Sequence, residues 1–150
     1  NKIYFSNQLF NLDNLSKNFE KYLKNSKNGS IPKLSINIHP RGYSPSKQKE
    51  LKVKFEKIIK NNINKFNYNL KKNISFVVGL TSTPIYLLAH KIKVIHIFNN
   101  KFFDSYNNKF WPSIKSKEID RYIYEYSIKR SNKILNFKKK SNLLFNNIIK

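Results

Sequence analysis

The stretch ISFVVGLTSTP, residues 74–84, decides the fold that the sequence predicts. Its first half, residues 74–79, is nearly all apolar, as is typical of a parallel strand that is covered on both faces. Its second half carries three hydroxyl side chains and then Pro84, a residue suited to the first turn of a helix. The stretch therefore predicts a buried strand, a polar turn and a helix in direct succession.

Strand-like and helix-like segments alternate along the rest of the chain. We expect further strands near residues 2–6, 33–38 and 93–98. We expect helices over about 14–25 with Asp13 as cap, from Ser44-Pro45-Ser46 onward, over about 117–137 and over about 141–149. Such alternation is typical of an α/β domain, here a Rossmann-like, doubly wound parallel sheet with helices on both faces.

A second polar patch, His39-Pro40-Arg41, follows the strand-like run that ends at Ile38. Open α/β sheets bind ligands at the carboxyl ends of their strands, which is where this patch and Thr81-Ser82-Thr83 both fall. Hydroxyls and free N–H groups at a helix start suit a phosphate, as do an imidazole and a guanidinium. We therefore predict a phosphate pocket formed by the two patches, with His39 as general acid.

Plainer roles stay open for these residues. Ser82 or Thr83 could serve as an ordinary helix cap, and Arg41 could pair with a carboxylate. We expect His90 and His96 to be structural, because one lies on the predicted helix after Thr83 and the other inside an apolar strand. The histidines lack a metal-ligand spacing and the acidic residues are scattered, so we expect no metal site.

The composition is that of a folded domain. Hydrophobic residues make up 39% of the 150 residues, which is enough for a core. The chain has no cysteine, which excludes a disulfide scaffold and a thiolate metal site. It shows no apolar run of membrane-spanning length and no signal-peptide pattern, so we expect a cytoplasmic protein. Because the chain contains no methionine and begins with Asn1, we expect it to be cropped from a longer protein.

The formal net charge of +22 raises the question of nucleic acid. Clustered basic residues release counterions from phosphates. Here, however, Arg41, Arg121 and Arg130 are the only arginines, and base-edge contacts favour arginine. An AT-rich genome would also produce this abundance of Lys, Asn, Ile, Phe and Tyr. We therefore do not expect nucleic acid to be the main partner, while peripheral contact with an anionic membrane stays an alternative.

The order of these motifs resembles that of bacterial sialyltransferases and polysialyltransferases. One strand ends in Ser6-Asn7-Gln8-Leu9, a later one in His39-Pro40, and a third in Ser82-Thr83 before a helix. The resemblance covers roughly residues 1–100. Members of that family have two Rossmann-like domains in the B-type glycosyltransferase architecture. Their second domain holds the phosphate of CMP-sialic acid with a His-Pro motif and a Ser-Ser/Thr motif.

The resemblance implies that residues 1–150 are a single nucleotide-sugar-binding domain, one half of such an enzyme. It implies transfer of sialic acid from CMP-sialic acid to a surface glycan, lipooligosaccharide or capsular polysaccharide, without a cofactor. The enzyme would work in the cytoplasm or at the inner face of the cell membrane. The family's general base lies in an Asp/Glu-Asp/Glu-Gly triplet that this chain lacks. We therefore expect the domain alone to bind the donor and not to transfer it.

Two other functions stay open. A cytidine-nucleotide-dependent polyol-phosphate transferase of similar fold would also place His-Pro after a strand. Its serine motif, however, usually has Asp and Tyr beside it, and residues 80–83 have neither. A basic module for RNA or acidic glycan would need exposed aromatic residues on one face, whereas most Phe and Tyr residues here fall on predicted core stripes.

Overall fold

The computed structural model describes residues 2–6, 11–25, 35–38, 42–63, 74–98, 106 and 111–129. Strands and helices alternate through β4, and a pair of strands follows. In chain order the elements are β1 (Lys2–Phe5), α1 (Leu12–Asn25), β2 (Ser35–Asn37), α2 (Pro45–Ile63), β3 (Ile74–Val78), α3 (Thr83–Ala89), β4 (Lys93–Ile97), β5 (Ile114–Asp120) and β6 (Ile123–Ile128).

The strands form one sheet in the order β2-β1-β3-β4-β6-β5. β1 pairs in parallel with both β2 and β3, and β3 pairs in parallel with β4. β6 runs antiparallel to β4, and β5 runs antiparallel to β6. The protein is therefore α/β with a mixed, mostly parallel sheet. The predicted alternation is confirmed through β4, whereas the prediction of a wholly parallel sheet is wrong at β5 and β6.

The region predicted as a helix over 117–137 begins with a β-hairpin instead. Ile114 of β5 pairs with Ile128 of β6, and Ile123 pairs with Ile97 of β4. Without β6, the edge of β4 would expose a row of unpaired backbone groups, and pairing with the hairpin satisfies them. Residues of this predicted helix beyond Lys129, and the whole helix predicted over 141–149, lie outside the described residues.

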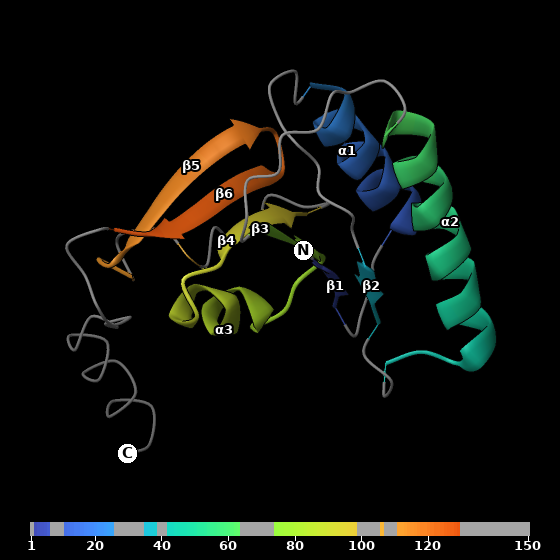
Figure 1. Ribbon diagram of the computed structural model, residues 1–150, viewed down its shortest axis with the longest axis horizontal. Helices are drawn as coiled ribbons and strands as arrows, with labels where there is room; N and C mark the ends of the chain where they lie inside the picture. The colour runs from blue at the N-terminus through green and yellow to red at the C-terminus, as the bar shows by residue number, and fades with distance from the viewer. Residues whose placement is uncertain are drawn as a thin grey trace, which may run out of the picture.

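Helices cover both faces of the sheet, as predicted (Figure 1). α1 and α2 lie side by side on one face, where the rings of Phe19 and Phe55 are 5.3 Å apart. Phe19 also meets Phe76 of β3 edge to face at 5.5 Å. α3 lies on the other face, where its Leu87 and Leu88 share a buried cluster with residues of β3, β4, β5 and β6.

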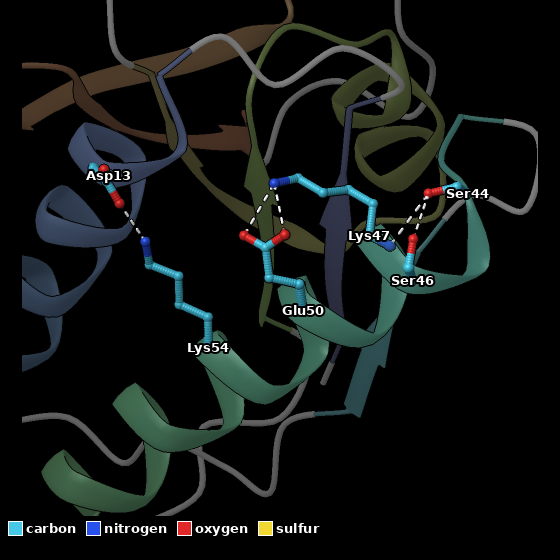
Figure 2. A network of polar contacts seen from close by, with 6 residues as sticks. All are labelled: Asp13, Ser44, Ser46, Lys47, Glu50 and Lys54. Carbon is cyan, nitrogen blue, oxygen red and sulfur yellow. Dashed lines mark hydrogen bonds and ion pairs between the residues drawn. The ribbon is translucent and has the colours of Figure 1, made fainter.

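Side chains beside α1 and α2 fix where these helices begin. Asn11 caps α1 in place of the predicted Asp13, because its Oδ1 accepts a backbone N–H of the first turn at 3.2 Å. Asp13 forms an ion pair with Lys54 that joins α1 to α2 (Figure 2). The Oγ of Ser44 accepts the N–H of Lys47 at 3.3 Å, so α2 begins directly after Ser44, as predicted.

α2 separates apolar from charged residues along its length. Leu51, Phe55 and Ile59 are buried, as the sequence predicts, while the lysines between them are mostly exposed. Part of that charge is paired, for example Lys47 with Glu50 at 2.8 Å (Figure 2). Among the described residues, no helix combines the length and the apolar character that crossing a membrane requires.

Candidate functional site

β1 and β3 lie side by side, and the strand order reverses between them. The chain passes from β1 to β2 on one side and then crosses to β3 on the other. Ligands of open α/β sheets bind outside the carboxyl ends of the strands at such a reversal. The residues that directly follow β1 and β3 are Ser6 and Gly79. The N–H of Ser6 donates to the carbonyl of Val78 at 2.9 Å. The carboxyl ends of β1 and β3 are therefore the place where the fold favours a ligand.

Thr81, Ser82 and Thr83 form the turn between β3 and α3, as predicted. Ser82 occupies the N-cap position, yet its side chain makes no capping hydrogen bond and is exposed. The hydroxyl of Thr81 instead accepts the N–H of Thr83 at 3.3 Å, and it lies 3.0 Å from the Thr83 hydroxyl. Ser82 is therefore the N-cap by position, one of the two alternatives expected, but the Thr81 hydroxyl and not the Ser82 hydroxyl accepts an N–H at the helix start. The Ser82 side chain is left to solvent.

His39, Pro40 and Arg41 lie outside the described residues, so the shared phosphate pocket of His39 and Ser82 stays a prediction. The described residues on either side of this segment are attached to the same sheet edge. Asn37, the last residue of β2, pairs with Tyr4 of β1. The hydroxyl of Tyr43 donates to the carbonyl of Ser6, directly after β1.

Three consecutive carbonyls after β3 accept hydrogen bonds from side chains that are distant in sequence. The pairs are Gly79 with Nε2 of His96 (2.7 Å), Leu80 with the hydroxyl of Ser6, and Thr81 with the hydroxyl of Tyr106 (2.6 Å). All three donor residues are buried. We call residues 79–83 the clamped loop, because buried side chains hold it from three separate segments of the chain.

The clamp determines where the N–H groups of the loop point. In a trans peptide the C=O and N–H point in opposite directions, and the described residues contain no cis bond. The N–H groups of Leu80, Thr81 and Ser82 therefore point away from the buried donors that hold the carbonyls. Within the described part of the chain these three N–H groups have no hydrogen-bond partner. Together with the Ser82 hydroxyl they offer donors to an anion.

The buried donors of the clamp are uncharged at neutral pH. Burial lowers the pKa of His96 to about 4 against a partial rise from its hydrogen bond to Gly79. Burial also raises the pKa of Tyr106 to about 12, so its hydroxyl keeps its proton. A carbonyl can only accept, so Nε2 of His96 carries the proton and Nδ1 does not. Nδ1 is buried and without a partner among the described residues.

The hydrogen bonds that hold the clamped loop are not apparent from the sequence. His96 is buried and bonded to backbone, and His90 is exposed with Nδ1 2.8 Å from the carbonyl of Tyr86. The structural roles expected for both histidines stay predictions. That His96 supports the loop after β3 could not be foreseen. A histidine inside an otherwise apolar strand was the available signal, since such a group needs a polar partner. Ser6 and Tyr106 carried no comparable signal.

The described residues contain no group of three His, Asp or Glu side chains that could hold a metal ion.

No protein-family model matches the chain, and neither a curated protein nor a solved structure shows significant similarity to it. The residues at the carboxyl ends of β1 and β3 are therefore the basis for a proposed function.

Proposed function

We propose that this chain is the nucleotide-binding half of a B-type glycosyltransferase that uses CMP-sialic acid. In this proposal the clamped loop binds the donor phosphate, and sialic acid is transferred to a surface glycan. The observation that supports it most is the state of the loop. Its carbonyls are occupied by buried donors, while the N–H groups of Leu80, Thr81 and Ser82 and the hydroxyl of Ser82 are not.

Hydroxyls and N–H groups supply the binding here more than the helix that follows. α3 has seven residues, so its dipole is smaller than that of a long helix. Successive N–H groups that face one way can hold an anion without a basic side chain. A phosphate at this place would also lie at the strand reversal where nucleotides bind in other open sheets.

The choice of a cytidine donor rests on the resemblance of His39-Pro40 and Ser82-Thr83 to the two phosphate motifs of sialyltransferases. His39 is proposed as the general acid that assists the departing phosphate, with Pro40 and Arg41 beside it at the nucleotide. In the two-domain enzyme that this proposal implies, conversion of His39 to alanine is expected to lower turnover of CMP-sialic acid by about 10²–10⁴-fold and to change CMP affinity much less. Near-normal turnover in a single-turnover assay would remove His39 from the chemistry.

Calorimetric titration of the chain with CMP, UMP and AMP tests the binding step. CMP is expected to bind most tightly, and the double variant Ser82→Ala/Thr83→Ala is expected to bind it about five- to a hundredfold more weakly, because each lost hydrogen bond contributes about 0.5–1.5 kcal/mol. Some affinity should survive, since the backbone N–H groups stay. Ser35→Ala, an exposed serine at the start of β2, is the matched control.

The same calorimetric assay, extended to CDP-glycerol, CMP-sialic acid and an RNA oligonucleotide, separates the competing functions. Tighter binding of CDP-glycerol than of CMP-sialic acid would favour a polyol-phosphate transferase. Binding of an RNA oligonucleotide without any response to mononucleotides would favour the basic module. A folded sample that binds none of the three mononucleotides would contradict the proposal.

A further inference from the structure

His96 is a polar residue on a strand whose neighbours are apolar. It pairs with Val77 of β3 and lies between Ile95 and Ile97, and its exposed fraction is 0%. Its ring is 3.8 Å from that of Phe98 and within aromatic contact distance of Tyr106 and Tyr126. A phenylalanine would fill such a site without burying a polar ring, but it would leave the Gly79 carbonyl without this donor.

The imidazole is only partly satisfied at this place. Nε2 donates to the Gly79 carbonyl at 2.7 Å, whereas Nδ1 has no partner among the described residues. A buried polar atom without a partner costs about 1–3 kcal/mol. The histidine therefore carries a cost at Nδ1, and the bond to the Gly79 carbonyl is what distinguishes it from an apolar residue.

Gly79 is the point at which the chain leaves β3 and turns toward Ser82. Its φ of 86° lies in the left-handed region that favours glycine. Its N–H donates to the carbonyl of Ile97 at 2.9 Å, and its carbonyl accepts from His96. Both backbone groups of this residue are thus held by β4, so β4 sets the direction in which the clamped loop departs.

His90 offers a natural comparison at the other end of α3. One of its ring nitrogens also lies 2.8 Å from a carbonyl, that of Tyr86, and its ring packs on the Tyr86 ring at 4.4 Å. The contacts resemble those of His96, but His90 is exposed and follows the last turn of α3. Its loss should leave the clamped loop unchanged.

We propose that His96 is the positioning residue of the clamped loop: by holding the carbonyl of Gly79 it keeps Leu80, Thr81 and Ser82 in the arrangement that receives the donor phosphate. This inference rests on the proposed function. His96 touches no substrate in this account, and it acts only through the backbone of Gly79. The Ser6 and Tyr106 hydroxyls hold the next two carbonyls in the same way.

Three variants test the proposal. His96→Phe keeps an aromatic ring but removes the donor, His96→Gln can place an amide N–H near the position of Nε2, and His90→Phe makes the matched change away from the loop. CMP affinity is measured by calorimetry, amide hydrogen exchange at residues 80–83 by NMR, and global stability by urea unfolding. We expect His96→Phe to weaken CMP binding by about tenfold and to accelerate exchange at Leu80, Thr81 and Ser82 by a similar factor. His96→Gln should recover most of both losses, and His90→Phe should match the wild type.

Results that differ from these expectations would contradict either the role of His96 or the proposed function. If His96→Phe keeps the wild-type affinity and loop exchange rates, or if exchange rises equally throughout α1 and α2, His96 serves general stability only and the proposal is wrong. If His96→Gln fails to improve on His96→Phe although it folds, the hydrogen bond to Gly79 is not the cause. If the wild type binds no cytidine nucleotide while the loop responds to His96→Phe, the proposed function fails and the support of the loop by His96 stands.

Discussion

The two faces of the sheet are built from different side chains. The face under α1 and α2 is packed with aliphatic residues and phenylalanines, such as Phe5, Phe19, Phe55 and Phe76. The face under α3 carries Tyr106, Tyr126 and His96, whose rings lie near one another. Phenylalanine can only pack, whereas tyrosine and histidine can pack and donate. The first face therefore stabilises the domain, and the second also shapes the loop where the ligand is proposed to bind.

Conversion of Phe55 to alanine should have the largest effect, and on stability alone. Its ring is fully buried, 4.7 Å from that of Phe5 and 5.3 Å from that of Phe19. Removing it should lower the free energy of unfolding by about 3–5 kcal/mol, measured by urea unfolding. CMP affinity, measured at a temperature where the variant is folded, should stay within about twofold of wild type. A large loss of affinity in folded protein would show that the two faces do not act separately.

Acidification should destabilise the protein through His96 on the α3 face. The pKa of His96 is about 4 in the folded protein and 6.5 in the unfolded chain, so between these values only the unfolded chain takes up the proton. His96 leaves the free energy of unfolding essentially unchanged well above pH 6.5 and lowers it as the pH drops toward 4. From pH 7 to pH 5 the loss is about 2 kcal/mol. Tyr106, with a pKa of about 12, does not titrate in this window.

Urea unfolding at several pH values checks this, with His96→Phe as the comparison. The wild type should lose stability between pH 7 and pH 5, and the variant should lose about 2 kcal/mol less. Equal pH dependence in the two proteins would mean that His96 is not buried in its neutral form.

Removing one hydroxyl from each face of the sheet should reveal the difference between the two faces through smaller effects. Tyr106→Phe leaves the carbonyl of Thr81 without its donor, which should cost about 1 kcal/mol and weaken CMP binding several-fold. Tyr22→Phe removes a hydroxyl from the other face, where the Tyr22 ring lies edge-on to Phe76. It should leave CMP affinity unchanged. Equal effects of the two variants on CMP affinity would contradict the special role of the α3 face.

The ion pair between Asp13 and Lys54 should matter least. The Lys54 ammonium, by hydrogen bond and charge, lowers the pKa of Asp13, but the carboxylate is largely exposed to water. Such pairs contribute little and are screened by salt. Asp13→Asn should change the urea midpoint slightly at low salt and not at high salt, and should leave CMP affinity unchanged. A marked change in affinity would link the outer surface of α1 and α2 to the ligand.

The sequence allowed the first four strands and the helices between them to be predicted, because each carries a clear pattern. The apolar run before Gly79 and the apolar stripe of Leu15, Phe19 and Leu23 required no knowledge of distant contacts. The hairpin was missed for a physical reason. Ile119, Ile123 and Tyr126 recur at nearly helical spacing, and the turn at Asp120-Arg121-Tyr122 lacks the Asn-Gly or Asp-Gly signal of a hairpin. Tyr122 adopts a φ of 70° without being glycine.

The candidate site was predicted only in part. Thr81, Ser82 and Thr83 could be placed at the end of a strand, because that follows from local pattern. The clamp could not be foreseen, since Ser6 lies 74 residues from Leu80 and Tyr106 lies 25 residues from Thr81. Such contacts depend on the strand order, which brings β1 beside β3, and no local pattern reveals it.

The central claim is that the loop after β3 binds the phosphate of a cytidine nucleotide. Titration of the ¹⁵N-labelled chain with CMP, followed by NMR, tests it most directly. We predict that the amide signals of Leu80, Thr81 and Ser82 shift most among the described residues and that those of α2 and the β5–β6 hairpin stay in place. Shifts confined to α2, or no shifts at millimolar CMP in a folded sample, would contradict it.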